Sequence, residues 1–437
     1  MSATLLPAAF VSRMQRDLPR EEQKAFFDAY EKPACRGIRV NSLKVSTEEF
    51  KKISPFALRP VPWEANGFYV AEERPGRHPY HFAGLYYCQE PSAMSVVPQV
   101  GARPGEMVLD LCAAPGGKST QLAQDMEGKG VLFCNEPVQA RAHILTQNIE
   151  RMGVRNAVAI CSRTADLARR FPNFFDRILV DAPCSGEGMF RKNPGEALKN
   201  WSEENVRLCA QRQRKILQDA ASMLTDGGTL AYSTCTFSRE EDEGQTELFL
   251  QEHPDFALVS QQKLYPHRAE GEGHYCAILK KETDEACGHA RYRWQREQVT
   301  PKERAAFLRF CETQLKHVPK GSLFAAGGVL YLLPVGMPYI DWAGTELLRA
   351  GVRAGEFAKD RFVPSHALAM CLRTEDAVRS VHCTVSEAEK YMRGETLLAD
   401  VSDGWCLVCA DAYPLGWGKA TGGVIKNHYP KGLRLVK

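Results

Sequence analysis

Two cysteines stand in short polar motifs whose residue types suit nucleophilic chemistry. Cys184 ends the run Asp181-Ala182-Pro183-Cys184, and Cys235 ends the run Ser233-Thr234-Cys235. A thiolate is a strong nucleophile, and the cations of Arg191-Lys192 could lower the pKa of a nearby thiol. The other cysteines on apolar runs are explained as small buried hydrophobic residues, so these two are the candidates for catalysis.

Such a pair of thiols suits methylation of cytosine at carbon-5. Carbon-5 is not nucleophilic by itself, but addition of a thiolate to carbon-6 makes an enamine that can attack a methyl sulfonium. A second group must then remove the carbon-5 proton so that the thiolate can leave. An acid such as Asp181 would assist near N3 and the exocyclic amine. The spacing alone leaves open which cysteine attacks.

A glycine-containing loop offers a place for a methyl donor. The apolar run of residues 107–112 leads into this loop, whose residues are Cys112, Ala113, Ala114, Pro115, Gly116, Gly117, Lys118 and Ser119. Glycines between a strand and a helix let a ligand approach the backbone, and the helix N-terminus offers free N–H groups. Three ligands compete for this pattern: a nucleoside triphosphate, a dinucleotide and S-adenosylmethionine.

An acidic residue after the next strand favours S-adenosylmethionine. Glu136 lies 20 residues after Gly116, where an acid can bind ribose hydroxyls. Taken alone, Glu136 is equally well explained as a carboxylate in a first helical turn, and Lys118 as a solvated side chain. A phosphate-binding loop would need glycine in place of Cys112, although Gly117-Lys118-Ser119 matches its end, and the dinucleotide pattern Gly-x-Gly-x-x-Gly is absent.

The loop and both cysteine motifs lie at the ends of short apolar runs that alternate with helical segments. This alternation predicts an α/β domain with a parallel sheet buried on both faces. The strands are expected at residues 107–112, 130–136, 157–161, 177–183 and 229–235, with a closing strand at 275–280 and the longest helix at 202–224. Because ligands bind beyond the carboxyl ends of such strands, the motifs should meet at one edge.

The rest of the chain divides into smaller units. Mixed patterns before the sheet and short apolar runs among glycines and prolines after it predict accessory modules. The expected units are an N-terminal accessory subdomain (1–90), the catalytic domain (91–283), a charged linker (284–300), a first small C-terminal domain (301–370) and a last domain (371–437). The helix at Trp201 is expected to pack against the sheet.

Composition excludes several classes of protein. The 437 residues are 44% hydrophobic with a formal net charge of +3, which excludes a polybasic binder. The 15 cysteines are scattered, and the sequence shows neither a signal peptide nor a run of about 18 apolar residues. We therefore expect a reduced, cytoplasmic protein with no membrane contact. Cys406 and Cys409 form the only C-x-x-C, so no metal site is expected.

Three long motifs together resemble those of the Sun (Fmu) family of RNA cytosine-5 methyltransferases. They are CAAPGGKS at residues 112–119, DAPCSGEGMFRK at 181–192 and YSTCT at 232–236, in the order that the family has. The upstream stretches RVNSLK and GLYYCQEPS resemble the N-terminal region of that family. Residues 414–434 are similar to the PUA-like RNA-binding domain of its RsmF branch, which modifies small-subunit ribosomal RNA.

The resemblance implies a class I (Rossmann-like) methyltransferase with an RNA-binding N-terminal subdomain and PUA-like small C-terminal domains. It implies S-adenosylmethionine as donor and 5-methylcytidine in 16S ribosomal RNA as product. Cys235 would be the nucleophile, Cys184 would assist release, and Asp181 would touch both cofactor and base. The implied cofactor-binding residues are Cys112, Ala113, Ala114, Pro115, Gly116, Gly117, Lys118, Glu136 and Asp181. The family's adenine-contacting aspartate is replaced by Arg163, so both Arg163 and Asp166 are assigned to that contact.

The C-terminal tail is the expected RNA contact. Residues 411–437 contain five Lys or Arg and one Asp, a net +4, whereas the whole chain carries +3. A charge run is usually a solvated face, but Trp417, His428 and Tyr429 are interleaved here, which favours phosphate contacts with base stacking. The expected RNA-binding residues are Lys192, Lys419, Lys426, His428, Tyr429, Lys431 and Arg434.

RNA of the small ribosomal subunit is the expected partner of a monomeric chain. Two other functions stay open. Gly117-Lys118-Ser119 and Asp181 would also suit an NTPase, and an inherited fold could serve as a non-catalytic RNA-binding or ribosome-assembly module.

Overall fold

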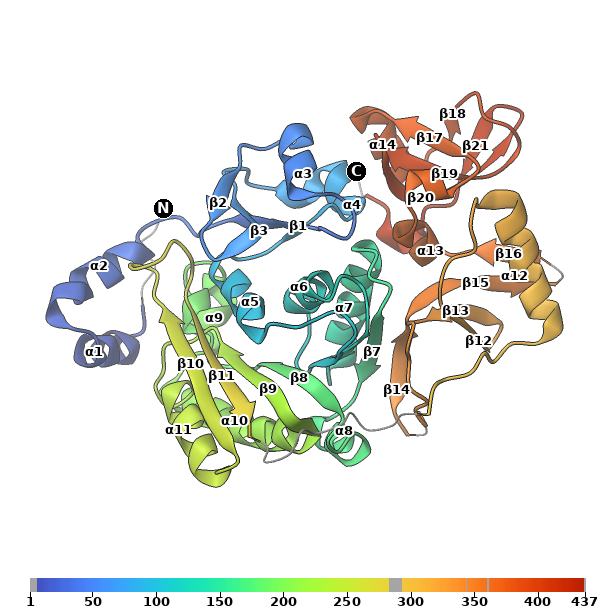
Figure 1. Ribbon diagram of the computed structural model, residues 1–437. Helices are drawn as coiled ribbons and strands as arrows, with labels where there is room; N and C mark the ends of the chain where they lie inside the picture. The colour runs from blue at the N-terminus through green and yellow to red at the C-terminus, as the bar shows by residue number, and fades with distance from the viewer. Residues whose placement is uncertain (1–5, 283–292, 343, 360, 436–437) are drawn as a thin grey trace.

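The computed structural model describes residues 6–282, 293–342, 344–359 and 361–435 (Figure 1). Cys287 and most of the predicted linker, with the terminal Lys437, lie outside the described residues. Within the described residues, no helix is both long and apolar enough to span a membrane.

An eight-stranded sheet forms the centre of the molecule, in the order β10-β11-β9-β8-β5-β6-β7-β14. Its five parallel strands are β5 (Met107–Asp110), β6 (Val131–Asn135), β7 (Ala157–Cys161), β8 (Phe175–Asp181) and β9 (Leu224–Thr234). At one side β11 (His274–Lys281) pairs antiparallel with β9, and β10 (Phe256–Leu264) pairs with β11. The predicted Rossmann-like parallel sheet and its closing strand are confirmed.

Alternate residues of the central strands enter two separate cores. Leu109, Phe133 and Ile178 pack in one core, whereas their neighbours Val108 and Leu132 pack in the other. This period of two explains why the strands read as continuous apolar runs. The helices beside the sheet are α5 (Val96–Val100), α6 (Gly117–Asp125), α7 (Gln139–Arg151), α8 (Thr164–Arg170), α9 (Pro194–Asn200), α10 (Glu203–Met223) and α11 (Glu243–Glu252).

The N-terminal residues form a helix pair and a small sheet. Helices α1 (Ala8–Asp17) and α2 (Arg20–Tyr30) lie apart from the sheet β2-β3-β1-β4, at the left of the view (Figure 1). The other elements here are β1 (Gly37–Val40), α3 (Thr47–Ile53), β2 (Arg59–Val61), β3 (Glu64–Tyr69), α4 (Pro79–Phe82) and β4 (Tyr86–Cys88).

The first C-terminal module shares a strand with the catalytic sheet. Its own sheet runs β12-β13-β15-β16, but β14 (Glu346–Ala350) pairs antiparallel with β7. This strand covers the open backbone edge of β7 and removes an exposed pairing surface. The elements of this module are α12 (Pro301–Gln314), β12 (Ser322–Ala326), β13 (Val329–Leu333), β15 (Val352–Ala358), β16 (Arg361–Pro364) and α13 (His366–Cys371).

The last module packs on the N-terminal sheet. Ile38 and Phe68 of that sheet belong to one hydrophobic core with Val408 and Ile425. Its sheet runs β17-β19-β20-β21-β18 beside α14 (Val385–Met392). The strands are β17 (Ser380–Cys383), β18 (Leu397–Leu398), β19 (Gly404–Ala410), β20 (Tyr413–Thr421) and β21 (Val424–Asn427). The two ends of the chain therefore stabilise each other.

Candidate active site

The two motif cysteines meet beyond the carboxyl ends of β8 and β9. These strands are parallel neighbours with Asp181 opposite Ser233, so the segments that follow them run side by side. The Sγ atoms of Cys184 and Cys235 are 3.3 Å apart. Contact with Cys235 and burial together raise the pKa of Cys184 well above its ordinary value. Cys184 is therefore a protonated thiol at neutral pH.

A buried carboxylate joins the two cysteine loops. Glu241 accepts hydrogen bonds from the Ser185 backbone N–H (2.9 Å) and from Gln213 of α10 (2.9 Å). The hydroxyls of Ser185 and Thr236, the residues after the two cysteines, share a hydrogen bond of 2.9 Å. Burial raises the pKa of Glu241 to about 7. Sequence reasoning missed Glu241, because nothing in its local pattern shows that it faces Ser185.

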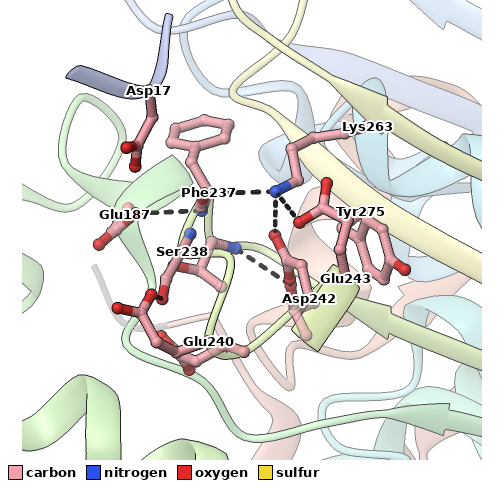
Figure 2. A network of polar contacts seen from close by, with 12 residues as sticks. Asp17, Glu187, Phe237, Ser238, Glu240, Asp242, Glu243, Lys263 and Tyr275 are labelled. Atoms are coloured by element: carbon pink, nitrogen blue, oxygen red, sulfur yellow. Dashed lines mark hydrogen bonds and ion pairs between the residues drawn. The ribbon is translucent and has the colours of Figure 1, made fainter. Parts of the chain in front are cut away.

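A second buried carboxylate ties the N-terminal helices to the same loops. Glu187 accepts hydrogen bonds from the Phe237 backbone N–H (3.0 Å), from the Trp201 indole (2.8 Å) and from Arg13 of α1 (2.5 Å). Figure 2 shows the contact between Glu187 and Phe237. The helix that follows Trp201, α10, packs against the sheet as predicted, since its Leu217 shares a core with Ile178 of β8. The Trp201 ring itself packs edge-on against Phe10 of α1, and its indole N–H is held by Glu187.

The segment after Cys235 is also anchored to β10. Asp242 accepts hydrogen bonds from Thr234 (2.5 Å) and lies 2.8 Å from Lys263 Nζ, which also contacts Glu243 at 2.8 Å (Figure 2). Burial disfavours the ammonium form of Lys263, but Asp242 outweighs that effect, so the pKa of Lys263 lies above its ordinary value.

Replacement of Lys263 by methionine is expected to destabilise the fold by about 1–3 kcal/mol, since it removes a hydrogen-bond partner of the buried Asp242 carboxyl, whose pKa burial already raises to about 8. Equilibrium denaturation measures the change. As a control, Lys24→Met breaks an ion pair with Asp28 in which Lys24 is 86% exposed, and should change stability by less than about 1 kcal/mol. Equal losses in the two variants would contradict the assigned role of Lys263.

The glycine loop lies between β5 and α6 as predicted. Gly116 has φ +109°, a left-handed conformation that favours glycine, and a Cβ there would lie 3.2 Å from Leu145. Arg141 donates to the Ala114 carbonyl (3.0 Å) and Asn148 to the Pro115 carbonyl (2.9 Å). The loop backbone is thereby held from α7.

A buried arginine from the N-terminal sheet supports the same loop. Arg39 donates to the Gly117 carbonyl (2.8 Å) and to Thr120 (2.7 Å), and its side chain is fully buried. Burial lowers the pKa of Arg39 to about 10. The stretch RVNSLK contains this residue, but its contact with α6 joins positions too distant in sequence for local pattern to show.

Charged side chains surround the loop. Lys118 Nζ lies 2.7 Å from Asp181 Oδ2, and Lys118 is buried, so its interpretation as a solvated side chain is wrong. Asp181 also accepts from Ser233 at 2.8 Å. Burial opposes the charged form of Asp181, but Lys118 and then His274 outweigh it and lower the pKa of Asp181. Asp181 is therefore a carboxylate at neutral pH.

Acidic side chains lie beside the loop together with the cations that pair with them. Glu136 follows β6 directly, is 1% exposed and pairs with Arg141 at 3.2 Å. Asp110 accepts from Ser119 (2.6 Å), and burial raises the pKa of Asp110 to about 7. Carboxylate oxygens here suit the ribose hydroxyls and the ammonium of S-adenosylmethionine. Lys118 is occupied by Asp181, so the residues present fit the methyl donor and not an NTPase site.

The two residues assigned to adenine lie at the start of α8. Arg163 and Asp166 pair with each other (Nε to Oδ2, 2.8 Å), and the Arg163 side chain is 80% exposed. Their contact with adenine stays a prediction.

Comparison with known proteins covers the whole chain. Residues 99–280 match the model described as 16S rRNA methyltransferase RsmB/F, and residues 6–91 match the N-terminal domain of 16S rRNA methyltransferase RsmF. Residues 309–372 and 378–435 match the RsmF first C-terminal domain and PUA domain. Ribosomal RNA small subunit methyltransferase F of Vibrio cholerae serotype O1 (strain M66-2) is 32% identical, over 98% of this chain and 97% of that protein.

The chain belongs to the RsmF family of methyltransferases. The protein of the same name from Escherichia coli O9:H4 (strain HS) is 32% identical over 98% of this chain and 96% of its own.

Solved structures agree with this family. A methyltransferase homolog protein from Pyrococcus horikoshii matches with a TM-score of 0.56 and 28% identity, over 63% of this chain and 100% of that one. NSun6 from the same organism has a TM-score of 0.57 at 21% identity, over 64% and 99%, and so shows the fold alone. This RsmF-family member is an S-adenosylmethionine-dependent RNA methyltransferase with a PUA domain.

Proposed function

We propose that this enzyme makes 5-methylcytidine in 16S ribosomal RNA by covalent catalysis through Cys235, with Cys184 assisting release. The observation that carries the proposal is the pair of Sγ atoms 3.3 Å apart, beside the Lys118–Asp181 pair at the cofactor loop. A methylation of a ring nitrogen or of ribose would not need two thiols at this position.

The two cysteines have different tasks in this scheme. Cys235 Sγ adds to carbon-6 of a cytosine flipped into the site, and the thiol proton of Cys235 passes to solvent. S-adenosylmethionine supplies, from its sulfonium, the methyl group that carbon-5 of the activated ring accepts. Once Cys235 is bonded to carbon-6, the first of the two causes that raise the pKa of Cys184 is lost, and burial is the one that remains. Cys184 gives up its proton to solvent and takes the carbon-5 proton as a thiolate, and Cys235 leaves carbon-6 as a thiolate when the ring regains its double bond.

Asp181 acts as an acceptor in this scheme. Because it is ionised, it cannot be the acid expected near N3, and it is suited instead to accept a hydrogen bond from the exocyclic amine. The Lys118 ammonium, 2.7 Å from Asp181, is the neighbouring group that carries a proton.

Methyl transfer from labelled S-adenosylmethionine tests the proposal. The wild-type enzyme is incubated with 16S ribosomal RNA, both naked and within small subunits, and the RNA is digested to nucleosides. Label in 5-methylcytidine supports the proposal, and label in any other nucleoside overturns it.

Fewer residues of the last module are available to contact RNA than the sequence predicts. Tyr429 is 4% exposed and packs edge-on against Tyr391, and Trp417 is buried with its indole bonded to the Ser365 carbonyl. Both predictions for base stacking are wrong, because these rings face the core. Lys419, Lys426 and His428 are exposed, and Lys192, Lys431 and Arg434 are exposed or half-buried, so they remain in the proposed RNA surface.

We propose Trp405 for base stacking, in place of the buried Trp417 and Tyr429. Register places Trp405 opposite Lys419, and Lys419 opposite Lys426, so the three share one face of the sheet. The His428 ring lies 4.5 Å from the Trp405 ring, and Lys419 Nζ lies 5.9 Å from its centroid. A cation row beside an aromatic ring suits a single-stranded RNA segment.

Replacement of Lys419 and Lys426 by glutamine is expected to weaken RNA binding at low salt and to reduce the slope of log K against log salt by about one to two. Binding of a 16S fragment at several salt concentrations measures this. Lys129→Gln, which removes an exposed lysine paired with Glu127, serves as the matched control. An unchanged salt slope in the double variant would remove these lysines from the RNA surface.

A further inference from the structure

His274 is a buried histidine at the catalytic edge to which sequence analysis gave no role. It begins β11, and the antiparallel pairing of Tyr275 with Thr234 places it beside Cys235. Its side chain is 4% exposed. Because β11 runs opposite to β9, its first residue lies at the edge where the parallel strands end.

The imidazole faces the Lys118–Asp181 pair without completing a hydrogen bond. His274 Nε2 lies 3.6 Å from Asp181 Oδ1, and within the described part of the chain neither ring nitrogen has a hydrogen-bond partner. A buried polar group without a hydrogen-bond partner destabilises the fold. Asp181 Oδ1 already accepts from Ser233, at 2.8 Å. A few tenths of an ångström would make His274 its next donor.

Burial and Lys118 keep the ring neutral, against the opposite effect of Asp181 and Glu90. Lys118, Asp181 and Glu90 face it, and Glu90 already accepts from the Glu272 backbone N–H at 2.9 Å. Burial and then Lys118 lower the pKa of His274. A neutral imidazole can donate one hydrogen bond to Asp181 without adding a positive charge to the site. Phenylalanine would fill the same space without the free-energy cost of burying a polar ring, so packing alone does not account for a histidine here.

We propose that His274 is a positioning residue, which donates a hydrogen bond to Asp181 and holds that carboxylate toward the target cytosine. This inference rests on the proposed function, in which Asp181 accepts from the exocyclic amine. Lys118 and Ser233 hold Asp181 in the resting site, and His274 supplies a further donor when the base competes for the carboxylate.

The test compares His274→Phe, which keeps the ring volume, with His274→Gln, which keeps a donor. Methyl transfer to 16S ribosomal RNA gives kcat and KM from pH 5 to pH 9, calorimetry gives the S-adenosylmethionine Kd, and thermal unfolding gives Tm. For His274→Phe we expect a roughly tenfold lower kcat with unchanged Kd. Because the pKa of Asp181 lies far below pH 5 and Lys118 stays in place, Asp181 remains ionised in the variant, and the loss of kcat should be the same across this pH range. His274→Gln should recover part of the loss.

Two results would overturn the inference. One is a His274→Phe variant with wild-type kcat at every pH. The other is a lower Tm with unchanged kcat per folded molecule, which is the mark of a structural role. His143→Phe, at an exposed position of α7, controls for loss of a histidine. The nucleoside made by the wild-type enzyme is read in the same assay, so failure of the cytosine assignment is distinguished from failure of the His274 assignment.

Discussion

A Cys184→Ala variant is expected to accumulate a covalent enzyme–RNA complex that survives denaturing gel electrophoresis. In the proposed scheme Cys235 still adds to carbon-6 and the methyl group is still transferred. Without the second thiol, 3.3 Å away in the resting site, the carbon-5 proton is not removed and the bond to Cys235 persists. Loss of a positioned proton acceptor costs about 10²–10⁴ in turnover, which is enough to make release the slow step.

The complex should be visible as a shifted band that contains both protein and labelled RNA. The complex that carries a methylated cytosine should form only when S-adenosylmethionine is present. The shifted band should disappear after nuclease digestion. The double variant Cys184→Ala/Cys235→Ala should show none. If Cys184→Ala turns over normally and leaves no band, Cys184 has no part in release.

Removal of the proposed nucleophile has the larger effect on turnover. Cys235→Ala should lower methyl transfer by at least about 10³-fold, because no other group supplies the bond to carbon-6. Binding of S-adenosylmethionine should persist, since the loop residues and Glu136 are held by contacts that do not involve Cys235.

A matched control variant distinguishes a folding defect from a catalytic defect. Cys311 is a buried cysteine of α12, and Cys311→Ala removes a thiol of the same size in the first C-terminal module, away from the strand ends. Cys311→Ala should retain activity. Cys235→Ala with undiminished methyl transfer would contradict the assignment, as would equal losses in both variants.

The catalytic loops are fixed from outside the catalytic sheet. Glu187 connects the segment after Cys184 with Phe237, and through Arg13 it connects both to α1. Arg39 does the equivalent for the cofactor loop from the N-terminal sheet. The N-terminal subdomain is therefore part of the active-site architecture, in addition to the RNA contact implied for it by resemblance.

The local sequence pattern was sufficient to predict which residues lie at the carboxyl ends of the strands. Apolar runs of period two, each followed by a polar motif, placed Glu136, Cys184 and Cys235 at one edge, because parallel strands must end together. The same pattern could not show that β14 of a later module completes the sheet, since an edge strand is chosen by a neighbour far along the chain.

Side-chain direction was the main source of error. Trp417 and Tyr429 stand among lysines in the sequence, yet Trp417 packs against Phe310 of α12 and Tyr429 packs against Tyr391 of α14. Trp405, on the same face of the sheet as Trp417 and Lys419, stays partly exposed. Lys118 looks like a surface lysine, but Asp181 makes its burial favourable. In each case a partner distant in sequence decides between solvent and core.

The sequence by itself determined the α/β architecture, the three motifs and the pair of thiols, because these depend on residue type and short-range periodicity. Only the tertiary structure decided the ionised state of Asp181, the protonated state of Cys184 and the place of His274 beside them. A pKa depends on burial and on charges within a few ångströms, and those neighbours arrive from strands, helices and modules that folding alone brings together.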